Sequence, residues 1–156
     1  MADVSWQNTD AALALEKWFG REVPDSRVLC LDTLSFALPI VRGVYTRSYL
    51  EMVRHMPHLW GYFYETTDDL QTRNGVIATL GELTEKLNLQ GLKKALSTFS
   101  PDVIIFTHFF GAAAIAESFA PSVPVCYVNT DFLSHVFHRN PSFSAWFVSS
   151  DETLRQ

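Results

Sequence analysis

Four side chains that could take part in acid–base or anion chemistry follow apolar runs of this sequence. His108 comes directly before a predicted helix, where free backbone N–H groups would favour an anion such as phosphate. Asp131 and His135 are four residues apart, so the carboxylate could orient the imidazole, and His135 could then act as a general base. Plainer alternatives remain: His108 could cap a turn, and Asp131 could shape its loop as an Asx turn. For Asp32, a helix cap or turn is the preferred interpretation.

Four short apolar runs end abruptly in small polar or acidic residues, and they define the elements that would position these side chains. The runs cover residues 28–31, 103–106, 123–128 and 146–148. Continuous apolar runs separated by helical segments are typical of buried parallel strands. In an open parallel sheet the ligand crevice lies outside the carboxyl ends of the strands, so the polar residues should converge in one cleft.

The pattern predicts an α/β fold in a single domain of residues 1–156: a Rossmann-like parallel sheet of about four strands with helices on both faces. The expected strands are 27–32, 102–107, 124–128 and 145–149. The expected helices are 10–19, 39–56, a short helix within 57–70, 72–98, 110–119 and a last helix after 149. Whether 72–98 is one helix or is broken near 88–91 stays open. Gly20 should end the first helix, and Ser149 with Glu152 has the spacing of a capping box at the last.

Composition excludes several classes of protein. Hydrophobic residues make up 47% and charged residues 19% of the chain, which is typical of a globular protein and not of a disordered one. The net charge of −5 argues against nucleic-acid binding, which needs a basic surface. The longest apolar stretch, 109–116, is too short to span a bilayer, and the N-terminus lacks the basic region and apolar run of a signal peptide.

The two cysteines, Cys30 and Cys126, fall inside expected strands and are spaced neither for zinc nor for a redox pair. We therefore expect both to be buried and reduced, as is usual in a cytosolic protein. We expect no metal site and no cofactor.

Three sequence elements carry a resemblance to a known family. Pro57–Tyr64 is similar to a Pro-x-Leu-Trp-Gly-x-x-Tyr segment, and Pro101–His108 to a Pro-Asp, apolar strand, Thr-His element. Residues 129–153 fit a Thr-Asp-Phe-x-x-His motif followed by an aromatic-Phe-Val-x-Ser strand. In this order they resemble the N-terminal, acceptor-side lobe of the monogalactosyldiacylglycerol synthases and processive diacylglycerol glucosyltransferases, which are GT-B type glycosyltransferases.

The resemblance implies an enzyme that moves a hexose from a UDP-sugar to the hydroxyl of diacylglycerol. Such a transfer needs a base for the acceptor, stabilisation of the leaving diphosphate and a cleft that orients both substrates. It implies that His108, Asp131 and His135 are the catalytic candidates, with Asp131 orienting a histidine or binding a sugar hydroxyl. The implied partners are a diacylglycerol-type lipid acceptor and, in a full-length enzyme only, a UDP-sugar.

The sequence also departs from the family pattern. The family's opening strand and its glycine-rich loop, whose histidine is the implied base, have no counterpart, and Asn8 stands where that histidine would be. An amide cannot take a proton from a hydroxyl. The nucleotide-sugar lobe also has no counterpart, so we expect the isolated chain to be inactive. The alternative is a catalytically dead, stand-alone lobe that binds a membrane surface or a protein.

Segment 39–64 combines basic and aromatic residues, which suits the interface of an anionic bilayer. The residues expected to contact membrane and acceptor are Arg42, Arg47, Arg54, Trp60 and Tyr62. Together with the resemblance, this predicts a cytoplasmic protein that is peripheral on the cytoplasmic membrane and contacts anionic lipids. The alternative is that the aromatic rings pack into the sheet while the arginines stay solvated.

The missing opening strand should affect the edge of the sheet. In the family it lies between the strands that match 27–32 and 102–107, and its loss would leave a gap of about 10 Å, two strand spacings. We expect 27–32 to move across and pair directly with 102–107. Otherwise both edges stay open, and the chain could associate through them.

Overall fold

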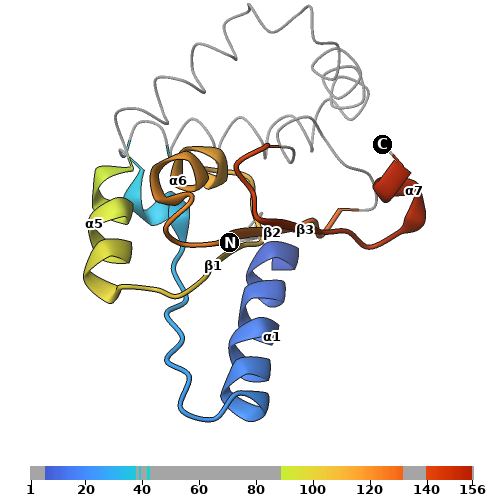
Figure 1. The fold of residues 1–156 in the computed structure, drawn as a ribbon, viewed down its shortest axis with the longest axis horizontal. Helices are drawn as coiled ribbons and strands as arrows, with labels where there is room; N and C mark the ends of the chain where they lie inside the picture. The colour runs from blue at the N-terminus through green and yellow to red at the C-terminus, as the bar shows by residue number, and fades with distance from the viewer. Residues whose placement is uncertain (1–5, 38, 40–41, 43–88, 132–139, 156) are drawn as a thin grey trace, which may run out of the picture.

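The computed structural model describes residues 6–37, 39, 42, 89–131 and 140–155, drawn in colour in Figure 1. The helix expected within 57–70, most of the one over 39–56 and the first part of 72–98 lie outside these residues. Pro39 and Arg42 are helical, in agreement with the helix expected over 39–56.

The centre of the fold is a parallel sheet of three strands in the order β1–β2–β3. The strands are β1 (Ile104–Phe106), β2 (Val125–Val128) and β3 (Ala145–Phe147), and they confirm the last three strands expected from the sequence. The register pairs Ile105 with Cys126 and Tyr127 with Trp146. With its helices the sheet forms an α/β, Rossmann-like lobe, although one strand fewer is described than expected.

Two helices pack with the sheet into one core. α5 (Gln90–Phe99) precedes β1 and buries two of its leucines, and α6 (Ala112–Phe119) is the crossover from β1 to β2. Gly111 caps α6 with a φ of 78°, and a Cβ added there would lie 3.1 Å from the Leu89 side chain. Glycine therefore serves both the left-handed turn into α6 and the close packing on Leu89.

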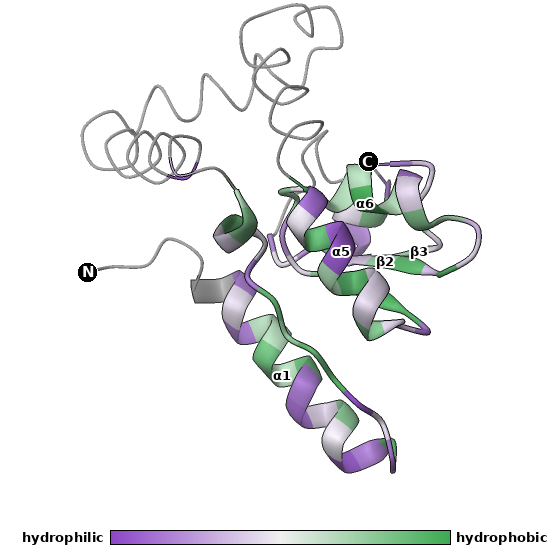
Figure 2. Ribbon diagram, turned by 90° about the vertical axis from the view of Figure 1, so that its left-hand side faces the viewer, coloured by the Kyte–Doolittle hydropathy of each residue, from purple (hydrophilic) through white to green (hydrophobic). Residues whose placement is uncertain are grey.

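α1 (Trp6–Glu22) is longer than the helix expected over 10–19. Gly20 does not end it, because one glycine costs a helix only about 1 kcal/mol relative to alanine. The chain turns after the helix, where Asp25 has a positive φ of 67°. Figures 1 and 2 show α1 alongside the extended segment that follows it, with both projecting away from the three-stranded sheet.

The strand expected over 27–32 is not formed. These residues are extended but belong to no ladder, and Val28 and Leu29 are 40% and 43% exposed. The expected direct pairing with 102–107 is therefore wrong, and the outer edge of β1 is open within the described part of the chain. An apolar run favours an extended backbone, but the backbone becomes a strand only where a neighbour supplies hydrogen bonds.

Asp32 caps the turn that follows this segment. Its carboxylate accepts a hydrogen bond from the backbone N–H of Leu34 (2.9 Å) at the start of the 3₁₀ helix η1 (Thr33–Phe36). The cap interpretation of Asp32 is confirmed.

The last helix, α7 (Asp151–Arg155), begins with a different cap from the one expected. The Oγ of Ser150, not of Ser149, accepts from the backbone N–H of Thr153 (3.2 Å). Ser149 instead donates from its Oγ to the backbone oxygen of Asp131 (3.2 Å), which explains the shift of the cap by one residue.

The core lies among the sheet, α5 and α6. Ile115 and Val125 are fully buried, and the buried ring of Tyr127 stacks on Phe143 with 5.4 Å between centroids. Among the described helices, none is both long and apolar enough to cross a membrane.

Candidate functional site

Polar side chains gather where β1 and β2 end, beside the amino-terminal end of α1. Thr107 follows β1 and donates from its Oγ1 to the backbone oxygen of Asn8 (2.9 Å). Thr130, just beyond β2, donates from its Oγ1 to Oδ1 of Asn8 (2.6 Å). One residue of α1 is thus bonded to the ends of two neighbouring strands.

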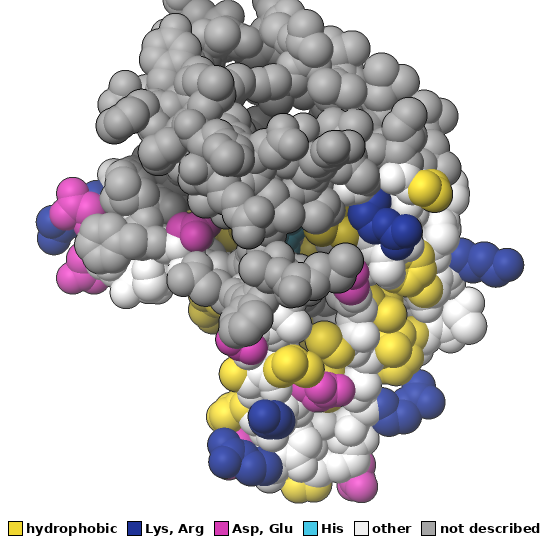
Figure 3. Space-filling model, turned by 180° about the vertical axis from the view of Figure 1, so that it is seen from behind, with side chains coloured by type: hydrophobic (Ala, Val, Ile, Leu, Met, Phe, Trp, Pro, Cys, Tyr) yellow, Lys and Arg dark blue, Asp and Glu magenta, His cyan; other side chains and the backbone are white. Residues whose placement is uncertain are grey.

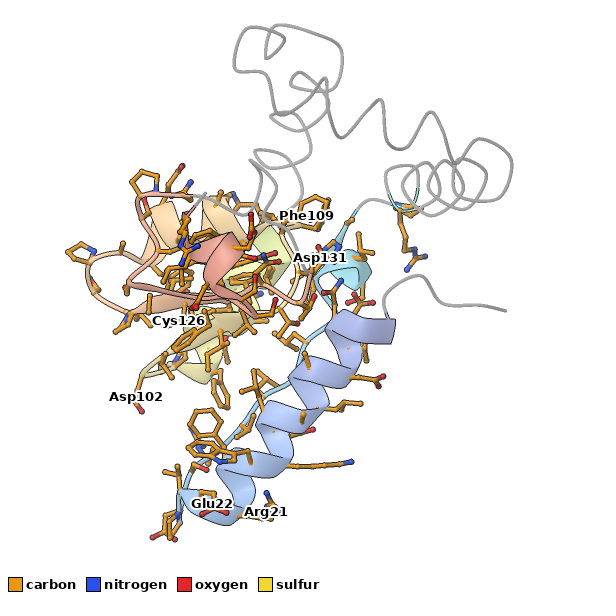
Figure 4. All side chains as sticks on the ribbon, turned by 90° about the vertical axis from the view of Figure 1, so that its right-hand side faces the viewer. Arg21, Glu22, Asp102, Phe109, Cys126 and Asp131 are labelled. Carbon is orange, nitrogen blue, oxygen red and sulfur yellow. The ribbon has the colours of Figure 1, made fainter. Side chains whose placement is uncertain are left out.

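We name these residues the strand-end cluster: Asn8, Thr107, His108, Asn129, Thr130 and Asp131. Asn8 comes from α1, and the other side chains come from the carboxyl ends of adjacent parallel strands, where an open sheet of this type places its ligands. In Figure 4, Asp131 and Phe109 lie toward one end of the sheet and Asp102, which precedes β1, toward the other.

His108 is held in one orientation by its own turn. Its Nδ1 accepts a hydrogen bond from the backbone N–H of Phe110 (3.1 Å), and its ring stacks on Phe109 with 4.5 Å between centroids. A neutral imidazole whose Nδ1 accepts carries its proton on Nε2. The structure therefore shows the turn-capping role of His108, and in this tautomer the ring presents no second acceptor nitrogen. Its proposed contact with substrate stays a prediction.

Asn129 was missed as a site residue by the sequence reasoning. Its Oδ1 accepts from the backbone N–H of Asp131 (3.1 Å), which forms an Asx turn at Asn129. An Asx turn at Asp131 would be closed by residue 133, which lies outside the described residues, so that alternative stays a prediction. Asn129 is only 3% exposed, and its Nδ2 has no acceptor among the described residues. Its position directly after the apolar run of β2 was the signal that could have identified it. A buried amide donor at a strand end is suited to bind a ligand oxygen.

Several predicted site residues lie outside the described residues: His135, Arg47, Arg54, Trp60 and Tyr62. The proposed pairing of Asp131 with His135 and the membrane-contacting segment therefore remain predictions. Arg42 is described, and its side chain is exposed on a helix.

The two cysteines are free thiols in different settings. Cys30 is exposed in the extended segment, so the expectation that it is buried in a strand is wrong, whereas Cys126 is half-buried on β2. Partial burial raises the pKa of the Cys30 thiol, and the carboxylate of Glu16 raises it further. Burial alone raises the pKa of Cys126. Within the described residues, no three His, Cys, Asp or Glu side chains are grouped to hold a metal ion.

The fold and the site define a class of protein: a Rossmann-like lobe with a polar cluster at the carboxyl ends of its strands. Over residues 8–156 the sequence matches the family described as monogalactosyldiacylglycerol (MGDG) synthase. The chain belongs to this family of glycolipid glycosyltransferases, which act on diacylglycerol. The resemblance found in the sequence is thereby confirmed. Comparison with curated proteins and with solved structures found no match.

Proposed function

We propose that this chain forms the acceptor-binding lobe of a glycolipid glycosyltransferase that moves a hexose from a UDP-sugar to diacylglycerol. The observation that carries the proposal is the strand-end cluster, in a chain whose sequence matches the MGDG synthase family over residues 8–156. The cluster would hold the glycerol hydroxyl of the lipid at the carboxyl edge of the sheet.

The chemistry of the cluster favours a hydroxyl over a diphosphate. Its side chains are two threonines, two asparagines, a histidine and one aspartate, and none of them is a lysine or arginine. A diphosphate is recognised by cationic side chains or by preorganised donors aimed at its charge. An uncharged hydroxyl needs one acceptor and one donor, which Asp131 and the Nδ2 of Asn129 can supply.

Two side chains of the same cluster are unsuited to act as the general base. The amide of Asn8 cannot accept a proton from a hydroxyl, and Nδ1 of His108 is already occupied by the Phe110 N–H. We propose that this chain binds the acceptor without transferring sugar, and that the UDP-sugar binds only in a full-length enzyme. His135, which stays a candidate base with Asp131, would be the residue to test first.

A lipid acceptor must be reached at a membrane surface. We propose that the lobe is peripheral on the cytoplasmic membrane and contacts anionic lipids through Arg42, Arg47, Arg54, Trp60 and Tyr62. The exposed side chain of Arg42 is consistent with this contact.

The proposal is tested by co-sedimentation of the chain with phosphatidylcholine vesicles that contain or lack dioleoylglycerol. We expect dioleoylglycerol to increase binding, and the variant Asp131→Ala to lose that increase. Asp151→Ala, at an exposed aspartate on α7, is the matched control and should behave as the unaltered chain. Equal binding to both kinds of vesicle would show that the cluster is not an acceptor site.

One observation favours the second candidate, a catalytically dead binding module. The outer edge of β1 is open among the described residues, and an open edge is a place where another polypeptide can bind.

A further inference from the structure

Two buried N–H donors near the carboxyl end of the sheet have no acceptor among the described residues. They are the Nδ2 of Asn129 and the Nε1 of the Trp146 indole. Both donor atoms are closed to solvent, and Asn129 as a whole is only 3% exposed. A buried donor without an acceptor destabilises a fold, because the hydrogen bond that it made to water in the unfolded chain is not replaced. A ligand that brings acceptor atoms to these donors recovers that loss.

The two donors belong to side chains on the same face of the sheet. β2 pairs with β3 so that Tyr127 lies opposite Trp146, and the side chains of paired residues point to the same face. The ladder continues beyond β2, because the backbone N–H of Asn129 donates to the oxygen of Phe147 (2.8 Å). Asn129 comes two residues after Tyr127, so its side chain returns to the face of Tyr127. Burial alternates accordingly, since Tyr127 and Asn129 are buried and Val128 between them is half-buried.

The donor atoms select the chemistry of the ligand. The Nδ2 of an amide and the Nε1 of an indole only donate, so they pair with an oxygen that only accepts. They carry no charge, and the strand-end cluster contains no lysine or arginine. On the face seen in Figure 3, the Lys and Arg side chains of the described residues project from the surface. A phosphate or carboxylate would lose its hydration here without a countercharge, whereas the neutral carbonyl oxygen of an ester needs none.

The surroundings of the two donors are apolar on one side and polar on the other. Trp146 packs against the buried core, and its strand neighbour Tyr127 stacks on Phe143 with 5.4 Å between ring centroids. An ester joins a carbonyl oxygen to a hydrocarbon chain, so it suits a few donors placed in an apolar setting. Asn129 directly precedes Thr130 and Asp131 of the strand-end cluster. A lipid whose hydroxyl lies at the cluster therefore has its ester groups next to Asn129.

We propose that Asn129 and Trp146 bind the ester carbonyl oxygens of diacylglycerol through Nδ2 and Nε1, which makes the lobe selective for ester-linked over ether-linked lipid. Ester recognition depends on the acceptor-binding function proposed above and adds the part of the lipid that is recognised. From strand spacing and rise, the two Cα atoms are about 8 Å apart, a separation that two esters on neighbouring glycerol carbons can span. The Nδ2 of Asn129 has two N–H groups, so it can donate to a carbonyl and to the hydroxyl at once.

The test compares two lipids that differ in these carbonyl oxygens. The full chain is co-sedimented with vesicles of a dialkyl phosphatidylcholine, which has no ester groups, containing either dioleoylglycerol or 1,2-di-O-oleylglycerol. Both lipids present the glycerol hydroxyl, but only dioleoylglycerol has carbonyl oxygens. We expect the apparent affinity for the dioleoylglycerol vesicles to be at least about fivefold higher, because the two hydrogen bonds form only with that lipid.

Protein variants test each donor. Trp146→Phe removes the indole N–H and keeps an aromatic ring, so it should reduce the preference for dioleoylglycerol to about twofold and leave the affinity for 1,2-di-O-oleylglycerol unchanged. A general loss of packing would weaken the binding of both lipids equally. Trp18→Phe, at an exposed tryptophan on α1, is the matched control and should keep the full preference. Asn129→Asp keeps the oxygen that accepts from the Asp131 N–H but replaces the donor by an acceptor, so it should also lower the preference.

A direct measurement follows the indole N–H of Trp146 on the unaltered chain. In the ¹⁵N-labelled protein its NMR signal is assigned through single Trp→Phe variants of the four tryptophans. Dioctanoylglycerol should move this signal downfield, as a new hydrogen bond does, and the dialkyl analogue should leave it in place. If circular dichroism shows that Trp146→Phe is unfolded, the other three variants assign the signal by elimination, and its response decides the question.

The possible outcomes separate ester recognition from acceptor binding. If neither lipid increases vesicle binding, the acceptor-binding function is wrong, and ester recognition is wrong with it. Equal increases with both lipids would leave acceptor binding standing and overturn ester recognition, and internal water would then be the partner of the two donors. A full preference for dioleoylglycerol in both Trp146→Phe and Asn129→Asp would also overturn the proposal, because the lipid would then be recognised by other groups.

Discussion

The Oγ1 of Thr130 donates a hydrogen bond of 2.6 Å to Oδ1 of Asn8, a residue 122 positions earlier in the chain. Thr107, at the end of the neighbouring strand, donates to the backbone oxygen of the same asparagine (2.9 Å). The beginning of α1 is therefore bonded to the ends of β1 and β2 together. Because the side chain that makes this connection is an amide, it stabilises the geometry of the strand ends and cannot act as a base.

Replacing Asn8 by leucine should lower the free energy of unfolding by about 1–2 kcal/mol, because the half-buried hydroxyl of Thr130 loses its acceptor. Asn8→Asp keeps an oxygen in place and should retain most of the stability. Urea denaturation followed by circular dichroism measures both variants. In a double-mutant cycle with Thr130→Val, strictly additive effects would show that the Asn8–Thr130 hydrogen bond contributes nothing.

Two glycines offer a matched pair of substitutions with opposite expected effects. Gly111→Ala should destabilise the chain by about 1–3 kcal/mol, because φ is 78° and the new Cβ would lie 3.1 Å from Leu89. Gly20→Ala should stabilise it by about 0.5–1 kcal/mol, because Gly20 is helical and a Cβ there meets nothing within 4 Å. Thermal unfolding measures both, and a neutral Gly111→Ala would show that the turn into α6 relaxes without strain.

The sequence predicted best those elements whose pattern and partners lie close together. β1, α6 and β2 form one strand–helix–strand unit within residues 102–128, and each was expected within about two residues of its observed bounds, the usual disagreement at element ends. The segment 27–32 was not predictable in the same way. Its apolar run is as clear as that of β1, but whether it becomes a strand depends on a neighbouring backbone, which local pattern does not encode.

The candidate site was predicted in part, for a similar reason. His108 and Asp131 were expected at strand ends and lie there. The bonds from Thr107 and Thr130 to Asn8 join segments about a hundred positions apart, so no local pattern could predict them. The cap of α7 was off by one residue because two adjacent serines fit it, and the bond from Ser149 to Asp131 selects Ser150.

Cys30 should react more slowly with iodoacetamide at pH 8 than a free cysteine does. Its raised pKa, due to partial burial and then to Glu16, leaves less thiolate at that pH, so its rate should keep rising at pH values where free cysteine has levelled off. Glu16→Gln should lower the pKa of Cys30 and increase its rate of alkylation. The rate of alkylation of Cys126, whose pKa is raised by burial alone, should not change. Mass spectrometry of the two alkylated peptides over a pH series measures both thiols. An unchanged Cys30 rate in Glu16→Gln would remove the carboxylate as a cause.

The 156-residue chain should show no hexose transfer to diacylglycerol and no measurable affinity for UDP-glucose or UDP-galactose. The strand-end cluster has no lysine or arginine for a diphosphate, and neither Asn8 nor His108 is available as a base in the described geometry. Calorimetric titration with each UDP-sugar measures the affinity, and an assay with dioleoylglycerol vesicles measures the transfer. A micromolar dissociation constant for either sugar nucleotide would contradict the prediction.

Segment 39–64 should promote association with anionic vesicles although the whole chain carries a net charge of −5. The segment contains three arginines, Arg42, Arg47 and Arg54, and one acidic residue, Glu51. It therefore carries a local excess of two positive charges. Each basic residue near an anionic surface contributes about 1 kcal/mol of binding free energy. Replacing the three arginines by glutamate should therefore reduce co-sedimentation with phosphatidylglycerol vesicles strongly, and added salt should weaken the binding of the unaltered chain.

A second triple variant separates this local effect from the total charge. Arg21→Glu, Lys94→Glu and Arg155→Glu change the net charge by the same amount at exposed positions on α1, α5 and α7. If segment 39–64 makes the membrane contact, this control variant should keep most of its vesicle binding. The basic residues of the segment and their aromatic neighbours are intact in it. Equal losses in the two triple variants would mean that only net charge matters. Unchanged binding after loss of Arg42, Arg47 and Arg54 would remove the segment as a membrane contact.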